Sequence, residues 1–167
     1  MRGILYGFAG GGVVVAAMAL VYSQSRAAFL SPVFQWSLTV IYLVAMILAA
    51  LRRPPAPRIE AIRSALVCYL LASASYYLYT YLLYEAFDPE LYELQSELMI
   101  ANAERFQSGQ PGRLADSPAV LYAPERLRYT LSGIAYNYAF GALSGAAVSF
   151  LLGTLLGRGD DPDTTTD

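Results

Sequence analysis

The chain offers few side chains that could perform acid–base, nucleophilic or metal chemistry. It contains no histidine and a single cysteine, Cys68. This composition removes the commonest ligands for zinc, haem and iron–sulfur clusters, and the usual residue for general acid–base catalysis. A lone cysteine in a packed helix usually behaves as a small hydrophobic residue. The sequence therefore predicts no metal site and no cofactor.

The remaining candidates for chemistry are scattered polar residues. Glu60 and Arg63 are three residues apart on one predicted helix face, where a simple salt bridge explains them. Glu85 and Asp88 lie near the end of a predicted membrane span, and Asn137 is a strongly polar residue inside the last span. None of these combinations has the nucleophile, base or metal cluster that an active site needs. We therefore expect no catalytic residues and no enzymatic activity.

The elements that carry these residues are long, uncharged and apolar. Apolar residues make up 56% of the 167-residue chain and charged residues only 14%. A helix of about 20 apolar residues crosses the ~30 Å hydrocarbon core of a bilayer. The sequence predicts an all-α, polytopic membrane protein with four transmembrane helices in a single domain over 1–157. The predicted spans are 3–25, 28–51, 62–87 and 129–157, with an extramembrane helical insert at 88–128 and a disordered acidic tail at 158–167.

The orientation follows from the charges between the spans. Four arginines and one glutamate lie within 52–63, the densest positive cluster of the chain. Basic loops stay on the cytoplasmic side, so we expect both termini in the cytoplasm and the insert outside. The predicted location is the bacterial inner membrane. The net charge of −2 leaves no basic surface for phosphates, so no nucleic-acid partner is expected.

The insert begins with a helix-start signal. Asp88 is a predicted N-cap, and Pro89 stands at the first helical position, where its missing N–H is not needed. The helix that follows carries apolar residues on one side and glutamates largely elsewhere. It is therefore predicted to be an amphipathic surface helix that lies at the outer boundary or docks a partner.

Aromatic residues gather in the predicted outer half of the spans. Tyrosine and tryptophan prefer the membrane interface, because one end of each side chain is apolar and the other is polar. This pattern favours an interfacial belt, with a pocket for a lipid or an aromatic ligand as the alternative. The predicted belt consists of Trp36, Tyr76, Tyr77, Tyr79, Tyr81 and Tyr84.

Small residues recur at every fourth position of the first and last spans. Such stripes let helix backbones approach closely within lipid. The predicted helix-packing residues are Gly3, Gly7 and Gly11, and Gly133, Asn137, Gly141, Gly145, Ser149, Gly153 and Gly157. We expect the first and last spans to pack antiparallel through these stripes. A homodimer seam on one of them is the alternative.

The order of these features, and above all the segment Phe87-Asp88-Pro89-Glu90, resembles the bacterial membrane family catalogued as domain-of-unknown-function family 4199. The resemblance implies four transmembrane helices and supplies no activity. The predicted function is that of a structural or accessory membrane subunit, which acts through helix packing and docking of its external helix. Its partner would be another membrane protein or a second copy in the lipid bilayer. The alternatives are a small-molecule or ion transporter or channel, which would need polar groups such as Asn137 along a path, and a lipid-binding membrane protein.

Overall fold

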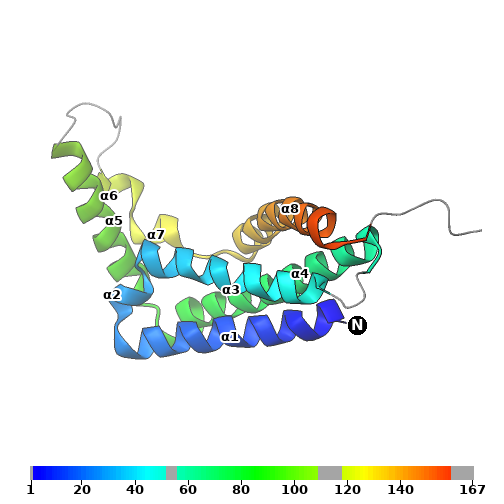
Figure 1. Ribbon diagram of the computed structural model, residues 1–167. Helices are drawn as coiled ribbons and strands as arrows, with labels where there is room; N and C mark the ends of the chain where they lie inside the picture. Colours follow the sequence, from blue (N-terminus) through cyan, green and yellow to red (C-terminus); the bar gives the residue numbers. More distant parts are fainter. Residues whose placement is uncertain (1, 52–55, 109–117, 159–167) are drawn as a thin grey trace, which may run out of the picture. The chain divides into compact units, whose positions relative to one another are not determined.

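The protein is all-helical, and the part of the chain that the structure describes carries four helices long and apolar enough to cross a membrane (Figure 1). The computed structural model describes residues 2–51, 56–108 and 118–158. The loop at 52–55, the middle of the insert at 109–117 and the tail at 159–167 lie outside the described residues. The helices are α1 (Arg2–Gln24), α2 (Arg26–Phe29), α3 (Pro32–Ala50), α4 (Arg58–Leu82), the π-helix η1 (Leu83–Phe87), α5 (Leu91–Ser108), α6 (Pro118–Leu121), α7 (Pro124–Leu127) and α8 (Leu131–Leu156). The prediction of an all-α polytopic membrane protein is therefore confirmed.

The four spanning segments are Arg2–Gln24, Pro32–Ala50, Arg58–Phe87 and Leu131–Leu156. The second span starts at Pro32 rather than at residue 28, because a separate short helix precedes it. The Ser25 hydroxyl accepts a hydrogen bond from the Ala28 N–H at 3.2 Å and caps this helix, α2. Pro32 then occupies the first turn of α3, where a missing N–H costs nothing.

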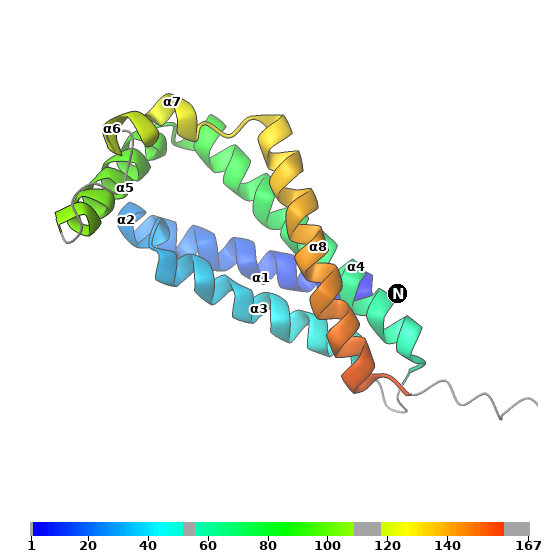
Figure 2. The same ribbon diagram turned by 90° about the horizontal axis from the view of Figure 1, so that it is seen from above.

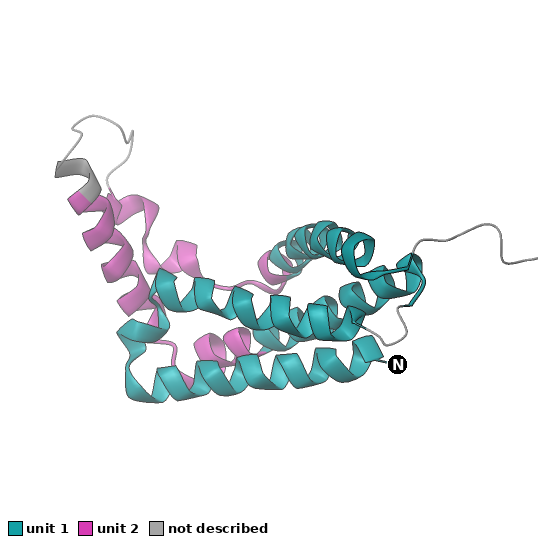
Figure 3. Cartoon of the chain, in the orientation of Figure 1, with its two compact units in different colours: residues 1–78, 135–167 teal, residues 79–134 magenta. Residues whose placement is uncertain are grey.

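Contacts divide the chain into two compact units (Figure 3). Unit 1 comprises residues 1–78 and 135–167, and unit 2 comprises residues 79–134. The helices α4 and α8 each contribute to both units. The single domain predicted over 1–157 is thus subdivided near one end of these two helices.

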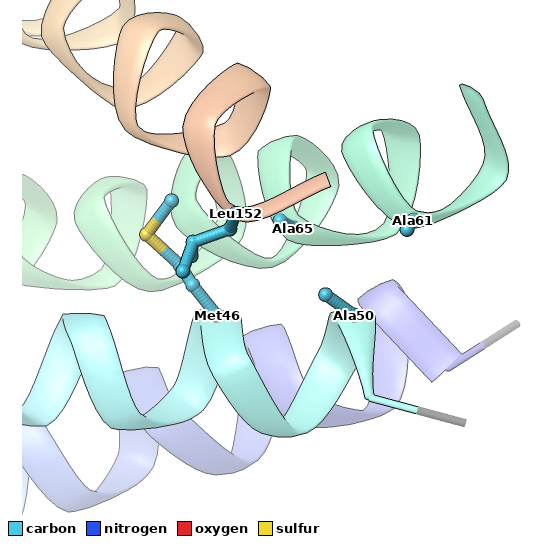
Figure 4. Packing of buried hydrophobic residues seen from close by; sticks show 5 residues of the cluster. All are labelled: Met46, Ala50, Ala61, Ala65 and Leu152. Carbon is cyan, nitrogen blue, oxygen red and sulfur yellow. The ribbon is translucent and has the colours of Figure 1, made fainter. Parts of the chain in front are cut away.

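In unit 1, α1 and α3 lie side by side, and α4 runs along both of them (Figures 1 and 2). A buried cluster joins three helices, with Met46 from α3, Ala65 from α4 and Leu152 from α8 (Figure 4). A second cluster joins Ala49 of α3 to Cys68 of α4. Small side chains dominate both clusters. In lipid, close van der Waals packing of this kind replaces the hydrophobic effect as the force that holds helices together.

One end of unit 1 is also closed by hydrogen bonds between chain segments. The Arg158 N–H donates to the Ala56 carbonyl at 2.8 Å. The Arg2 guanidinium donates to the Leu51 carbonyl, at the end of α3, at 3.2 Å. A cation at a helix C-terminus is favourable because the helix dipole is negative there.

Candidate functional site

The helix α4 is the element on which the other spans of unit 1 pack, and Gly3, Gly7 and Gly11 of α1 face it. A Cβ atom built on Gly3 would lie 2.5 Å from the Ser64 carbonyl oxygen. One built on Gly11 would lie 2.6 Å from the Ser75 hydroxyl. The residue numbers rise together on the two helices, so α1 and α4 run parallel. These glycines allow the backbones of α1 and α4 to approach more closely than any residue with a side chain would permit.

The last span uses its glycines against the same helix. Gly145 packs against the ring of Tyr69, and Gly153 packs against Ile62. A Cβ on Gly157 would lie 2.6 Å from the Arg58 Cα. Here the numbers on α8 rise as those on α4 fall, so the two helices run antiparallel.

The prediction that the first and last spans pack through their glycine stripes is therefore corrected. Both stripes pack on α4, which carries a small-residue stripe of its own that the sequence analysis missed. These residues are spaced alternately by four and three positions, the period of a straight seam between helices. They are Ala61, Ala65, Cys68, Ala72 and Ser75, and the first four are at most 1% exposed.

The stripe of α8 also changes face along the helix. Positions four apart differ by 400°, so the stripe rotates by about 40° at each step. Gly145, Ser149 and Gly153 are buried, whereas Asn137 is exposed. Gly133 and Gly141, at the other end of the stripe, are half-buried. Only the second half of the stripe is therefore tightly packed, and the Asn137 side chain points away from it.

The tyrosines at the end of α4 and in α8 bond across helices. The Tyr76 hydroxyl donates to Gln35 Oε1 at 3.0 Å, and Gln35 Nε2 donates to the Phe29 carbonyl at 3.0 Å. The Tyr77 hydroxyl donates to the Asn137 carbonyl at 3.2 Å. The Tyr138 hydroxyl donates to the Leu70 carbonyl at 3.1 Å.

The members of the predicted aromatic belt therefore differ in their surroundings. Trp36 is 76% exposed, as a lipid-facing residue is. Tyr76, Tyr77, Tyr79 and Tyr81 are half-buried, and Tyr84 is buried. Gln35 accepts the hydrogen bond of the Tyr76 hydroxyl. This role could not be predicted, because a single glutamine near the start of a span belongs to no periodic pattern.

Unit 2 is built around three tyrosines whose rings pack against one another in tilted and edge-on arrangements. The ring of Tyr84 lies 4.8 Å from that of Tyr92 and 5.0 Å from that of Tyr129. The Tyr84 hydroxyl donates to Gln95 Oε1 at 2.9 Å. The Tyr92 hydroxyl donates to Glu85 Oε1 at 2.8 Å and accepts from the Tyr129 N–H at 2.8 Å. Tyr92 thus ties η1, the helix α5 and the segment before α8 into one cluster.

The predicted helix start at Asp88 and Pro89 lies at the junction between η1 and α5. The Asp88 N–H donates to the Leu83 carbonyl at 2.8 Å, which is the wide turn of a π-helix. The Leu91 N–H donates to the Asp88 carbonyl at 3.1 Å. Pro89 comes next in the chain. Its nitrogen carries no hydrogen and cannot donate a helical hydrogen bond, so the helical hydrogen bonding is interrupted at this residue.

Replacing Tyr92 with phenylalanine is expected to loosen unit 2. Burial raises the pKa of the Tyr92 hydroxyl above its ordinary range; the Tyr129 N–H lowers it in part, and Glu85 raises it further. Because the folded-state pKa is the higher one, this group stabilises unit 2 below about pH 10 and loses that effect as the pH rises further. Tyr92→Phe removes this pH dependence and the hydrogen bond that the Tyr129 N–H donates to the Tyr92 hydroxyl, at a cost of about 1 kcal/mol. Hydrogen exchange at the Tyr129 amide measures the loss.

Tyr81→Phe is the matched control, since Tyr81 is half-buried in the same unit and its hydroxyl has no hydrogen-bond partner among the residues that the structure describes. Equal protection of the Tyr129 amide in both variants would contradict the assigned role of Tyr92.

The residues first considered for chemistry have different surroundings. Glu60 and Arg63 are exposed on α4, and Cys68 is fully buried among apolar side chains. Within 2–51, 56–108 and 118–158, no three cysteine or acidic residues gather as a metal site would require. The chain matches no protein-family model, no curated protein and no solved structure.

Proposed function

We propose that the protein is a structural or accessory subunit of a membrane assembly, and that α8 docks a second membrane helix. The observation that carries this proposal is the exposed Asn137 side chain. It lies on a helix of 26 residues, about 39 Å long, some 9 Å longer than the hydrocarbon core. Asn137 is the seventh residue of this helix. With the excess length shared between the two ends, its amide lies about 5 Å inside the hydrocarbon.

An amide in hydrocarbon is stabilised by a partner on another helix. Among the described residues, the Asn137 side chain has no hydrogen-bond partner; the Tyr77 hydroxyl bonds to its backbone carbonyl instead. Interhelical polar contacts in membranes contribute about 1 kcal/mol each. An asparagine both donates and accepts, so a second copy or an unrelated helix can satisfy it.

The rest of the outer face of α8 suits such a partner. The most apolar stretch of α8 is 17% buried within the chain, against 28% for each of the other three spans. Exposed residues, four of the six small or polar, recur at alternating three- and four-residue spacing. They are Asn137, Phe140, Ser144, Ala147, Leu151 and Thr154. This spacing gives a continuous seam along one side of a helix.

The orientation of the protein in the membrane, and the membrane in which it lies, are part of the same proposal. The described arginines at the closed end of unit 1 are Arg2, Arg58, Arg63 and Arg158, and Glu60 is the one acidic residue beside them. The positive-inside rule supports a cytoplasmic position for this end, in a bacterial inner membrane. The exposed glutamates of α5, Glu93, Glu97 and Glu104, then offer a second docking surface outside. Membership of domain-of-unknown-function family 4199 is likewise proposed from the resemblance alone.

Cysteine crosslinking in native membranes tests the docking of α8. Ser144→Cys, in a Cys68→Ala background, is expected to give a linked species with a short bifunctional thiol reagent. Ala139→Cys is the control, because Ala139 is exposed on another side of the same helix. A product of twice the chain mass identifies a second copy, and any other mass identifies a different partner.

Adding Asn137→Leu is expected to reduce the crosslinked fraction about fivefold, which corresponds to the ~1 kcal/mol of one interhelical contact. Equal crosslinking from both cysteine positions, or no effect of Asn137→Leu, would overturn the proposal.

A further inference from the structure

A cavity of about 220 Å³ lies between α3 and α4 in unit 1. Trp36 and Gln35 line it from α3 near the start of that helix, and Tyr42 lines it further along. Tyr69 and Tyr76 line it from α4. Trp36 is largely exposed, so the cavity reaches the surface of the bundle at this residue. For comparison, an apolar cavity of about 150 Å³ binds benzene, so this one accommodates a substituted six-membered ring.

The chemistry of the lining selects the kind of ligand. None of the residues that line the cavity is charged, and five of the eight are aromatic. A phosphate or carboxylate would have no counter-charge here and would bear a large desolvation cost. Flat aromatic walls instead favour a flat, neutral group packed against them.

Tyr42 and Tyr69 both line the cavity, and the Tyr69 hydroxyl lies beside Gly141 of α8. Tyr42 and Tyr69 pack ring to ring, with centroids 5.9 Å apart. Among the described residues, neither hydroxyl has a hydrogen-bond partner. The Tyr76 hydroxyl, by contrast, is already held by Gln35, which fixes that ring at the edge of the cavity. Two unused phenolic donors in an apolar cavity suit a ligand that carries carbonyl oxygens.

We propose that this cavity binds the neutral, carbonyl-bearing head group of a membrane lipid, with the Tyr42 and Tyr69 hydroxyls as donors to its oxygens. Two kinds of lipid supply this chemistry, namely isoprenoid quinones, through their ring carbonyls, and neutral glycerides, through their ester carbonyls. The proposal concerns binding and does not depend on the docking of α8.

Trp36 provides a direct reporter, because it is the only tryptophan of the chain and lines the cavity. The full-length protein, purified and delipidated in a neutral detergent, is titrated with a decyl-substituted benzoquinone, and the Trp36 emission is recorded. Saturable quenching is expected. The double variant Tyr42→Phe/Tyr69→Phe keeps the rings and removes both donors, and we expect about tenfold weaker binding. Tyr136→Phe is the control, since Tyr136 is 71% exposed on α8 and does not line the cavity.

Competition with dioctanoylglycerol distinguishes the two sources. The glyceride is added to the quinone-quenched protein. If Trp36 emission recovers at glyceride concentrations below that of the quinone, the natural ligand is an ester lipid; if it does not recover, the natural ligand is a quinone. Quenching that rises linearly without saturation, or that is equal in the double phenylalanine variant and the wild type, would overturn the proposal, because it reports only partitioning of the quinone into the micelle.

Discussion

Gly153→Leu is expected to lower the free energy of unfolding of the transmembrane bundle by about 3 kcal/mol, the upper part of the usual range for overpacking a tight interface. Gly153 is buried in α8 against Ile62 of α4, and a Cβ atom at this position would also lie 2.9 Å from the Ile62 backbone nitrogen. Backbone atoms cannot rotate away as a side chain can. The added side chain must therefore separate α8 from α4, which also disrupts the contact of Leu152 with Met46 and Ala65.

Cys68 gives the measurement, since its thiol is fully buried in the folded bundle. The detergent-solubilised protein is titrated with sodium dodecyl sulfate, and the fraction of Cys68 that reacts with a thiol reagent in a short pulse reports unfolding. Ala139→Leu is the matched control, because it places the same side chain at an exposed position of α8 outside the proposed docking seam. A Gly153→Leu midpoint equal to those of Ala139→Leu and the wild type would show that α8 does not need its close contact with α4.

The four spans could be predicted because each is an uninterrupted apolar segment of sufficient length, and hydropathy needs no knowledge of neighbours. The structure nevertheless adds local features that hydropathy does not record. The short helix α2 is capped by the Ser25 hydroxyl and closed by backbone hydrogen bonds to the Ser25 and Arg26 carbonyls. The π-helix η1 contains a hydrogen bond between residues five apart, at the junction before Pro89. Each rests on a few local contacts rather than on a repeated pattern.

The packing residues were predicted with the wrong partner for a related reason. Glycine at every fourth position indicates that a helix is closely approached, but not which helix approaches it. The matching surface of α4 is built from Ala61, Ala65, Cys68 and Ala72, and no glycine marks it. Its signal is the alternating spacing of four and three residues. The same reasoning explains why Asn137 was expected to be a packing residue. Although it belongs to the four-residue stripe, its side chain points about 160° around the helix axis from that of Gly153.

Two glycines of α1, Gly7 and Gly12, allow the effect of close packing on stability to be separated from the intrinsic effect of glycine on a helix. A Cβ on Gly7 would lie 2.8 Å from the Leu71 Cβ and 3.1 Å from the Cys68 carbonyl oxygen, whereas nothing lies within 4 Å of a Cβ on Gly12. Gly7→Leu is expected to destabilise the bundle by about 2 kcal/mol through overpacking. Gly12→Leu is expected to leave stability unchanged or to raise it by up to about 0.8 kcal/mol, because leucine has the higher helix propensity.

The Cys68 labelling assay also distinguishes these two variants. Because Gly7 packs directly beside Cys68, separation of α1 from α4 should expose the thiol at lower sodium dodecyl sulfate concentrations, before α8 leaves the bundle. The Gly12→Leu protein should retain the wild-type labelling curve or a more resistant one. If both variants were destabilised to the same extent, close approach of α1 to α4 would not be the role of these glycines. A seam with a second copy, on the Gly12 face of α1, would then better explain the glycine stripe of α1.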